Sequence, residues 1–223
     1  DFGFRHLRVV NEYAVPFDSA RSAVDASEVL AGAMGFGSVA EAVADCTLGV
    51  GTTAVGERVL LHPLHALPEA AEEIKSALEQ EGRVALLFGS EKTGLSNEEL
   101  SHCNWLTTIP MQEYEDARHP SMNLGQAAAV CLYELVRQAE DATPGDAPAP
   151  ADAAATAGER ERLTALLAEV LCESGYTLRH PSNCSDEQMR RLVTRMGVSA
   201  SDAPVWMGIL RQILWKLRAA DAS

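Results

Sequence analysis

The residues whose types and spacing could support chemistry lie in two short segments of the 223-residue chain. In the first, an apolar run ends at Gly89 and is followed by Glu91 and Gly94. Glycines let the backbone approach a ligand closely, and the carboxylate between them could orient other polar groups. In the second, Ser121 and Asn123 precede a long segment rich in apolar residues. Short polar side chains and unpaired backbone N–H groups at a helix start can bind polar ligand atoms.

Strands and helices must position these two segments. Residues 84–88 (VALLF) predict a buried strand that is closed by Gly89, and residues 106–109 predict another strand. Residues 122–138 predict a helix, and Pro120 and Ser121 just before it are typical of a helix start. Alternation of strands and helices is typical of an α/β fold with a mostly parallel sheet. Ligands of such sheets bind beyond the carboxyl ends of the strands, where both segments lie.

The remaining chain continues this alternation and then becomes helical. Short apolar runs predict strands over residues 7–10 and 46–50. Composition, amphipathic spacing and the capping boxes of Ser96 and Ser185 predict helices over residues 19–34, 67–81, 96–103, 159–174, 185–196 and 202–218. We therefore expect an α/β domain over residues 1–138 and a small all-α domain over residues 159–223.

Between these two parts, residues 139–158 read AEDATPGDAPAPADAAATAG. The segment has three prolines and no large apolar side chain. Because it cannot bury enough surface to fold, we interpret it as a flexible linker.

Charge and composition restrict the class of protein. The formal net charge is −14, which argues against nucleic-acid binding because phosphate contacts need Lys and Arg. Residues 159–223 are an exception, with 9 basic and 8 acidic side chains. Arg190, Arg191, Arg195, Arg211 and Lys216 could form an RNA-binding face there. The alternative is an ordinary solvated helix face.

Other residue types offer less specific signals. No apolar run approaches the roughly 20 residues of a membrane span, and the five cysteines show no paired or zinc-ligand spacing. We expect no metal and a reducing, cytoplasmic setting. The six histidines are interpreted as surface or capping residues, and Trp206 and Trp215 as core or interface residues rather than base-stacking platforms.

Two segments carry the sequence motifs of a known family. Residues 86–95 read LLFGSEKTGL, and residues 109–134 read IPMQEYEDARHPSMNLGQAAAVCLYE. In order and spacing, over about fifty residues, they resemble the second and third motifs of the SpoU/TrmH class of RNA 2′-O-ribose methyltransferases, within the SPOUT superfamily. Residues 2–10, 20–30 and 51–58 are similar to the TrmJ-like subgroup, as is the tail through its segment GILRQILWKL.

The resemblance implies a fold and an activity. Members carry a deep trefoil knot in the carboxyl-terminal part of the α/β domain and pair as homodimers. They transfer a methyl group from S-adenosylmethionine to a ribose hydroxyl of RNA. The TrmJ-like subgroup implies tRNA as the substrate, at position 32 of the anticodon loop. Alternatives are a ribosomal RNA substrate, an inactive member that binds cofactor or RNA, and a generic nucleotide-binding domain, although the chain lacks the glycine-rich motifs of the last class.

The resemblance also assigns roles to residues. Glu91, Ser121 and Asn123 would be active-site residues, Glu91 orienting other groups and Asn123 fixing the catalytic loop and the ribose. Residues that would line the cofactor pocket by resemblance are Thr52, Thr53, Gly89, Ile109, Ser121 and Met122. The chemistry of the residues adds two more positions to this pocket. Gly94 would let the backbone approach the ligand closely, and Met111 would form an apolar wall for the adenine together with Ile109. Taken singly, Glu91 could be a solvated carboxylate and Ser121 a helix cap.

Two departures from the family pattern stand out. The arginine that activates the ribose hydroxyl in the family has no counterpart in the chain, because the matching stretch would precede Asp1. We therefore expect a preceding segment to supply it. The loop of residues 112–120 is acidic, which is unusual beside an RNA site.

Overall fold

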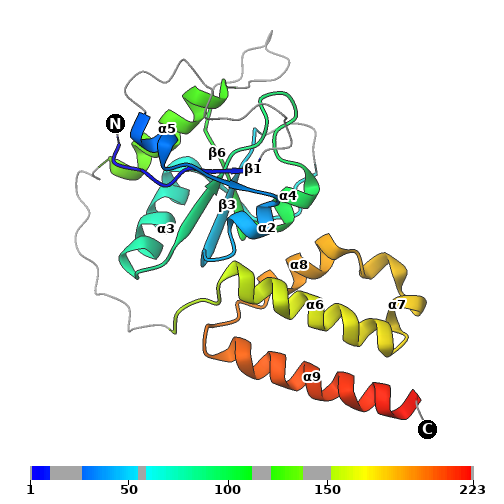
Figure 1. Cartoon of the computed structure of the whole chain (residues 1–223). Helices are drawn as coiled ribbons and strands as arrows, with labels where there is room; N and C mark the ends of the chain where they lie inside the picture. The colour runs from blue at the N-terminus through cyan, green and yellow to red at the C-terminus, as the bar shows by residue number, and fades with distance from the viewer. Residues whose placement is uncertain (1, 11–26, 55–58, 112–121, 138–151, 222–223) are drawn as a thin grey trace.

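The computed structural model describes residues 2–10, 27–54, 59–111, 122–137 and 152–221. Figure 1 shows a sheet flanked by helices in the first two-thirds of the chain and a group of helices at its carboxyl end. The predicted Ser121 and the acidic loop lie outside the described residues.

The main sheet has four parallel strands in the order β4-β6-β3-β5. Their bounds are Leu48–Thr52 for β3, Leu64–Ala66 for β4, Val84–Leu87 for β5 and Trp105–Thr108 for β6. A second, two-stranded sheet pairs β1, Arg8–Val10, with β2, Met34–Phe36, also in parallel. The prediction of an α/β fold with a parallel sheet is confirmed. Because the strands of the main sheet run in one direction, their carboxyl ends meet at one edge.

Helices cover the main sheet and close its core. Their bounds are Ser27–Ala31 for α1, Val39–Ala42 for α2, Leu67–Glu79 for α3, Asn97–Ser101 for α4 and Leu124–Val136 for α5. Ile74 of α3 and Val50 of β3 are almost fully buried in one apolar cluster. The capping box predicted at Ser96 is present, since its hydroxyl accepts from the Glu99 N–H and the Glu99 carboxylate accepts from the Ser96 N–H.

Some elements differ from the sequence prediction. Only α1 is described within the helix predicted over residues 19–34, and Met34 lies in strand β2 instead. Strands β2 and β4 were not predicted, because three residues are too few to show an alternating pattern. They form because they pair with longer or better-buried neighbours, β4 with β6 and β2 with β1.

The carboxyl-terminal helices pack around a core of their own. Three of them match the predicted helices, namely α6, Ala157–Glu173, α8, Asp186–Arg195, and α9, Asp202–Asp221. The short helix α7, Tyr176–Arg179, and a 3₁₀ turn over Pro181–Asn183 were not predicted. The buried residues of this cluster come from all three long helices and include Leu163, Val193 and Leu210.

The carboxyl end of the predicted linker is packed rather than free. Helix α6 begins at Ala157, and Ala155 is fully buried. The Ala157 and Gly158 N–H groups donate to the carbonyls of Cys46 and Ala44, at 2.7 and 2.8 Å. A side chain at position 158 would collide with the Ala44 carbonyl. The small residues here therefore allow two backbones to meet.

Arg160 is the buried centre of this seam between α6 and the sheet. Its guanidinium donates to the carbonyl oxygens of Ala155 and Thr47, at 2.5 and 3.1 Å, and to the Asn104 side chain at 3.3 Å. Asn104 in turn accepts from the Gly49 N–H of β3. One side chain thus connects the start of α6 to the amino ends of β3 and β6.

Arg160→Ala is expected to lower the free energy of unfolding by about 3 kcal/mol. The Ala155 and Thr47 carbonyl oxygens would lose this donor, and the Asn104 oxygen would keep only the Gly49 N–H. Chemical denaturation measures this change. Arg162→Ala, on the exposed side of the same helix, is the matched control and should cost less than about 0.5 kcal/mol. Equal losses for the two variants would contradict a role for Arg160 in holding the seam.

Candidate active site

The predicted cofactor residues lie at the carboxyl edge of the main sheet. Thr52 ends β3, Gly89 follows β5, and Ile109 and Met111 follow β6. Since β6, β3 and β5 are adjacent, the three strand ends are neighbours. The sheet therefore brings together residues that are up to 59 positions apart in the sequence.

The loop after β5 folds back tightly on itself. A β-carbon on Gly89 would lie 2.1 Å from the carbonyl carbon of Gly94, far inside van der Waals contact. Gly94 has a positive φ of 68° and donates its N–H to the Ser90 carbonyl at 2.9 Å. The Ser90 and Thr93 hydroxyls also hydrogen bond, at 2.7 Å. Gly89 is thus required by the loop itself, in addition to the ligand approach that the sequence suggested.

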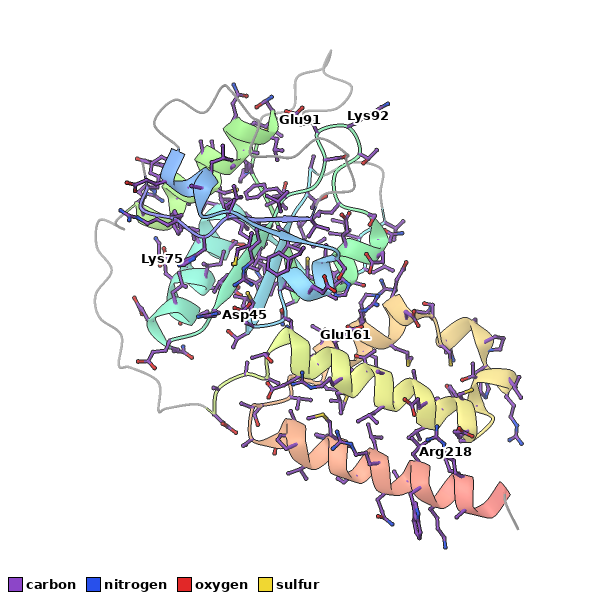
Figure 2. The ribbon with its side chains drawn as sticks, viewed as in Figure 1. Asp45, Lys75, Glu91, Lys92, Glu161 and Arg218 are labelled. Carbon is purple, nitrogen blue, oxygen red and sulfur yellow. The ribbon has the colours of Figure 1, made fainter. Side chains whose placement is uncertain are left out.

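Glu91 and Asn123 meet across the site although 32 residues separate them. The Asn123 side-chain N–H donates to a Glu91 carboxylate oxygen at 3.0 Å. The Asn123 side-chain oxygen caps α5 by accepting from the Gly125 N–H at 2.9 Å. Both ends of the amide are therefore fixed. Figure 2 shows Glu91 at the end of the molecule farthest from the carboxyl-terminal helices.

Asn123, rather than Ser121, is the residue that caps α5, which begins at Leu124. The helix was predicted to begin two residues earlier. The difference follows from the backbone of Asn123, whose ψ of 143° is extended rather than helical. Asn123 is thus both the cap and the partner of Glu91.

Threonine side chains line the ends of β3 and β6. The Thr52 hydroxyl donates to the Leu87 carbonyl at 2.9 Å and ties β3 to β5. The Thr53 N–H donates to the Thr107 carbonyl at 3.0 Å. Thr107 is 1% exposed, and its hydroxyl has no hydrogen-bond partner among the described residues. Sequence reasoning missed Thr107, whose only signal is a hydroxyl within an otherwise apolar strand.

Apolar side chains border the same edge. Ile109, Met111 and Met122 are each half-buried. A partly exposed apolar surface beside strand ends is suited to the flat face of a purine. Gly94 lies next to open space, so its backbone is accessible to a ligand. These residues fit an adenosine-containing cofactor.

The arginines predicted to bind RNA separate into two groups. Arg190 lies in the seam, where its guanidinium contacts Glu161 at 3.1 Å and the Ser101 hydroxyl at 3.3 Å, and only 16% of its side chain is exposed. Arg191 is also largely buried. Neither arginine therefore lies on the exposed RNA-binding face that the sequence suggested, because α8 packs on α4. The exposed members are Arg195, Arg211 and Lys216.

Two small hollows also lie at this seam, and none of the predicted cofactor residues lines either of them. His62 lines one hollow beside Arg191 and Arg195. Burial first, and then the two guanidinium groups, lower the pKa of His62. Two other histidines pair with carboxylates, His65 with Glu73 and His102 with Glu98. In the described parts of the chain, no group of three or more His, Cys, Asp or Glu side chains could hold a metal ion.

Gly89→Ala is expected to destabilise the protein more than Gly94→Ala. The first change forces a β-carbon into the backbone of Gly94 and Leu95, and a cost of about 3 kcal/mol or more is expected. The second meets open space and carries mainly the left-handed backbone penalty of about 1 kcal/mol. Free energies of unfolding measured by chemical denaturation test this order, and a reversed order would show that the close crossing is not required.

Comparison with known proteins identifies relatives of the chain. The sequence profile of the SpoU rRNA Methylase family matches residues 1–133. The uncharacterized tRNA/rRNA methyltransferase LasT of Serratia marcescens is 39% identical over 146 residues, which cover 64% of this chain and 69% of LasT. The tRNA (cytidine/uridine-2′-O-)-methyltransferase TrmJ of Yersinia pestis (strain Pestoides F) is 32% identical over 217 residues, or 95% of this chain and 81% of that protein.

A solved structure is similar over nearly the same extent. The crystal structure of TrmJ from Z. mobilis ZM4 superposes with a TM-score of 0.76 at 29% sequence identity. The superposition covers 95% of this chain and 88% of that one. The likeness therefore includes the carboxyl-terminal helices as well as the sheet.

Proposed function

Because the chain belongs to the SpoU rRNA methylase family, we propose that it is an S-adenosylmethionine-dependent RNA ribose 2′-O-methyltransferase acting on tRNA. The observation that carries the proposal is the hydrogen bond between Glu91 and Asn123. It joins the two family motifs at the carboxyl edge of a parallel sheet, where such folds bind their ligands. The likeness to TrmJ proteins over 95% of the chain supports tRNA as the substrate.

The residues that would hold the cofactor surround this hydrogen bond. Ile109, Met111 and Met122 would contact the adenine, and the backbone near Thr53, Gly89 and Gly94 would meet the polar parts. Thr52 holds two of the strand ends together, and Thr107 brings a buried hydroxyl that has no hydrogen-bond partner in the described parts of the chain. When bound, S-adenosylmethionine supplies a sulfonium methyl group that an oxygen nucleophile can displace.

The protein's own residues would act mainly by orientation. Glu91 and the Gly125 N–H hold the Asn123 amide in one position. A second side-chain N–H of Asn123 is then available to a ribose oxygen, in a fixed direction. Fixed placement of the acceptor relative to the methyl donor removes the entropic cost of alignment in the reaction step. Ser121 would serve the same site from the segment before α5.

Family likeness further supports a trefoil knot in the carboxyl-terminal part of residues 1–138 and a homodimer. The dimer proposal has independent support from α5, which exposes several large apolar side chains despite its position beside the sheet. They are Leu124, Val130, Tyr133 and Val136. Phe2 packs edge-on against Tyr133 and is itself 38% exposed, which extends the surface. A second subunit would bury these side chains.

By family likeness, we propose position 32 of the anticodon loop as the target nucleotide. The exposed side chains of Arg195, Arg211 and Lys216 would contact RNA phosphates in an otherwise acidic protein. A tRNA substrate and five free cysteines favour the cytoplasm. Within the described residues, no helix is long and apolar enough to cross a membrane.

Glu91→Ala is expected to lower the turnover number for methyl transfer about 10- to 100-fold, because Asn123 would lose one of its two fixed contacts. Calorimetric affinity for S-adenosylmethionine should change much less. Lys92→Ala, at the exposed neighbouring position, is the control and should retain activity. If Glu91→Ala and Lys92→Ala behave alike, the carboxylate does not position the site.

The proposed function itself is tested by transfer of a tritiated methyl group from S-adenosylmethionine with the full-length gene product. Label is expected in purified tRNA, at a ribose of position 32. Label in ribosomal RNA alone would support the second candidate, which the family description favours. Absence of cofactor binding by calorimetry would refute both candidates.

A further inference from the structure

Helix α9 has an exposed apolar face directed away from the rest of the protein. Its opposite face is buried and packs Ala203, Met207, Leu210 and Leu214 into the carboxyl-terminal core. Figure 1 shows α9 as the outermost helix at that end of the molecule. The outward face, defined by Val205, Trp206, Ile209 and Ile213, has exposed fractions of 59, 40, 45 and 42%. We propose that this outward face of α9 binds the same face of α9 in a second copy of the chain, in antiparallel orientation.

The spacing of these residues is that of a helix-pairing surface. Trp206, Ile209, Ile213 and Lys216 follow one another at intervals of three, four and three residues. Intervals of three and four place side chains on one stripe of a helix, and their repetition is the pattern by which two helices pack along a seam. A helix that only covers its own core needs one apolar face, whereas α9 has two.

Charges at the ends of the stripe select the partner and its direction. Asp202 and Lys216 each lie seven residues from Ile209, on opposite sides, which is about 10 Å along the helix axis. A two-fold axis at Ile209 would place Asp202 of each copy beside Lys216 of the other. A two-fold contact is self-complementary in this sense. Parallel pairing would instead place like charges together.

The electrostatics of the whole chain point to the same helix. The formal net charge of −14 makes two copies repel one another over most of their surface. The sequence of α9 carries three basic residues, Arg211, Lys216 and Arg218, and two acidic ones. Arg218 pairs with Glu169 and Glu173 of its own chain, on the side facing α6 (Figure 2). Contact through α9 therefore avoids much of the repulsion.

The steric requirements are also met. Gly208 lies one residue before Ile209, and a β-carbon there would meet nothing within 4 Å. It lies about 100° around the helix from Ile209, on the flank of the stripe, where its small size does not obstruct a partner helix. The α9 surface lies at the opposite end of the molecule from α5 (Figure 1). Pairing through α9 is thus separate from the proposed α5 dimer and does not depend on methyltransferase activity.

The first test compares the molar mass of the full chain and its variants by sedimentation equilibrium. Ile209→Glu should lower the molar mass of the assembly, to a monomer if only α9 pairs, and weaken α9 association by at least about tenfold. Leu178→Glu is the matched control, because Leu178 is 87% exposed on α7 and outside the stripe. Its mass should remain that of the wild type. An unchanged mass for Ile209→Glu, with circular dichroism confirming the fold, would overturn the proposal.

A charge exchange tests the antiparallel orientation. Asp202→Lys and Lys216→Asp should each weaken association several-fold, and the double variant should restore it, since each copy then presents the opposite charges in reversed order. Failure of the double variant to restore association would exclude antiparallel pairing.

The same charge variants distinguish self-association from RNA binding at this face. If RNA were the occupant, Lys216→Asp would weaken tRNA binding in fluorescence anisotropy. The added Asp202→Lys would then change tRNA binding without changing the molar mass. Loss of tRNA affinity with an unchanged molar mass would contradict pairing and favour RNA. Loss of mass in each single variant, with the mass restored in the double variant, is the result that we expect.

Discussion

The crossing of the chain at Gly89 is the constraint on which the candidate site depends. The backbone of Gly94 and Leu95 passes so close to Gly89 that no side chain fits between them. This contact returns the loop to the end of β5 and buries Leu95 in a cluster with Leu100 and Leu106. Glu91 is left at the tip of the loop, where it accepts the hydrogen bond of Asn123. Without the crossing, the carboxylate and the amide would have no common position.

The amino and carboxyl edges of the main sheet have different structural roles. The amino edge holds the carboxyl-terminal helices, through Arg160 and the backbone contacts of Ala157 and Gly158. The carboxyl edge keeps its polar groups, Thr107 and Asn123 among them, on the opposite side of the domain. The seam therefore anchors the helices without occupying the edge where the reaction is proposed to take place. The carboxyl-terminal helices lie far from Glu91 (Figure 2), which agrees with the roles in RNA contact and assembly that we propose for them.

Electrostatics explain why the carboxyl-terminal helices differ from the rest of the chain. Arg190 pairs with Glu98 and Glu161 across the seam, which stabilises the docking of α8, whereas Arg191 pairs with Glu187 of its own helix. Their charge is consequently not presented to a ligand. Arg195, Arg211 and Lys216 remain exposed, so the basic surface available to RNA is smaller than the count of arginines suggests.

Local sequence determined the elements whose signals are strong and short in range. The run VALLF, the capping boxes of Ser96 and Ser185, and the family motifs around Glu91 and Asn123 predicted strands and helix starts close to where they lie. Backbone hydrogen bonding and side-chain capping act within a few residues, so they are readable from sequence. Only the tertiary structure decided three other features. It showed that Asn123 meets Glu91, that the alanines and glycine before Arg160 form a packed seam, and that α9 has a second apolar face that stays exposed among the described residues. Each depends on which distant backbone or side chain arrives at a position, and no local pattern records that.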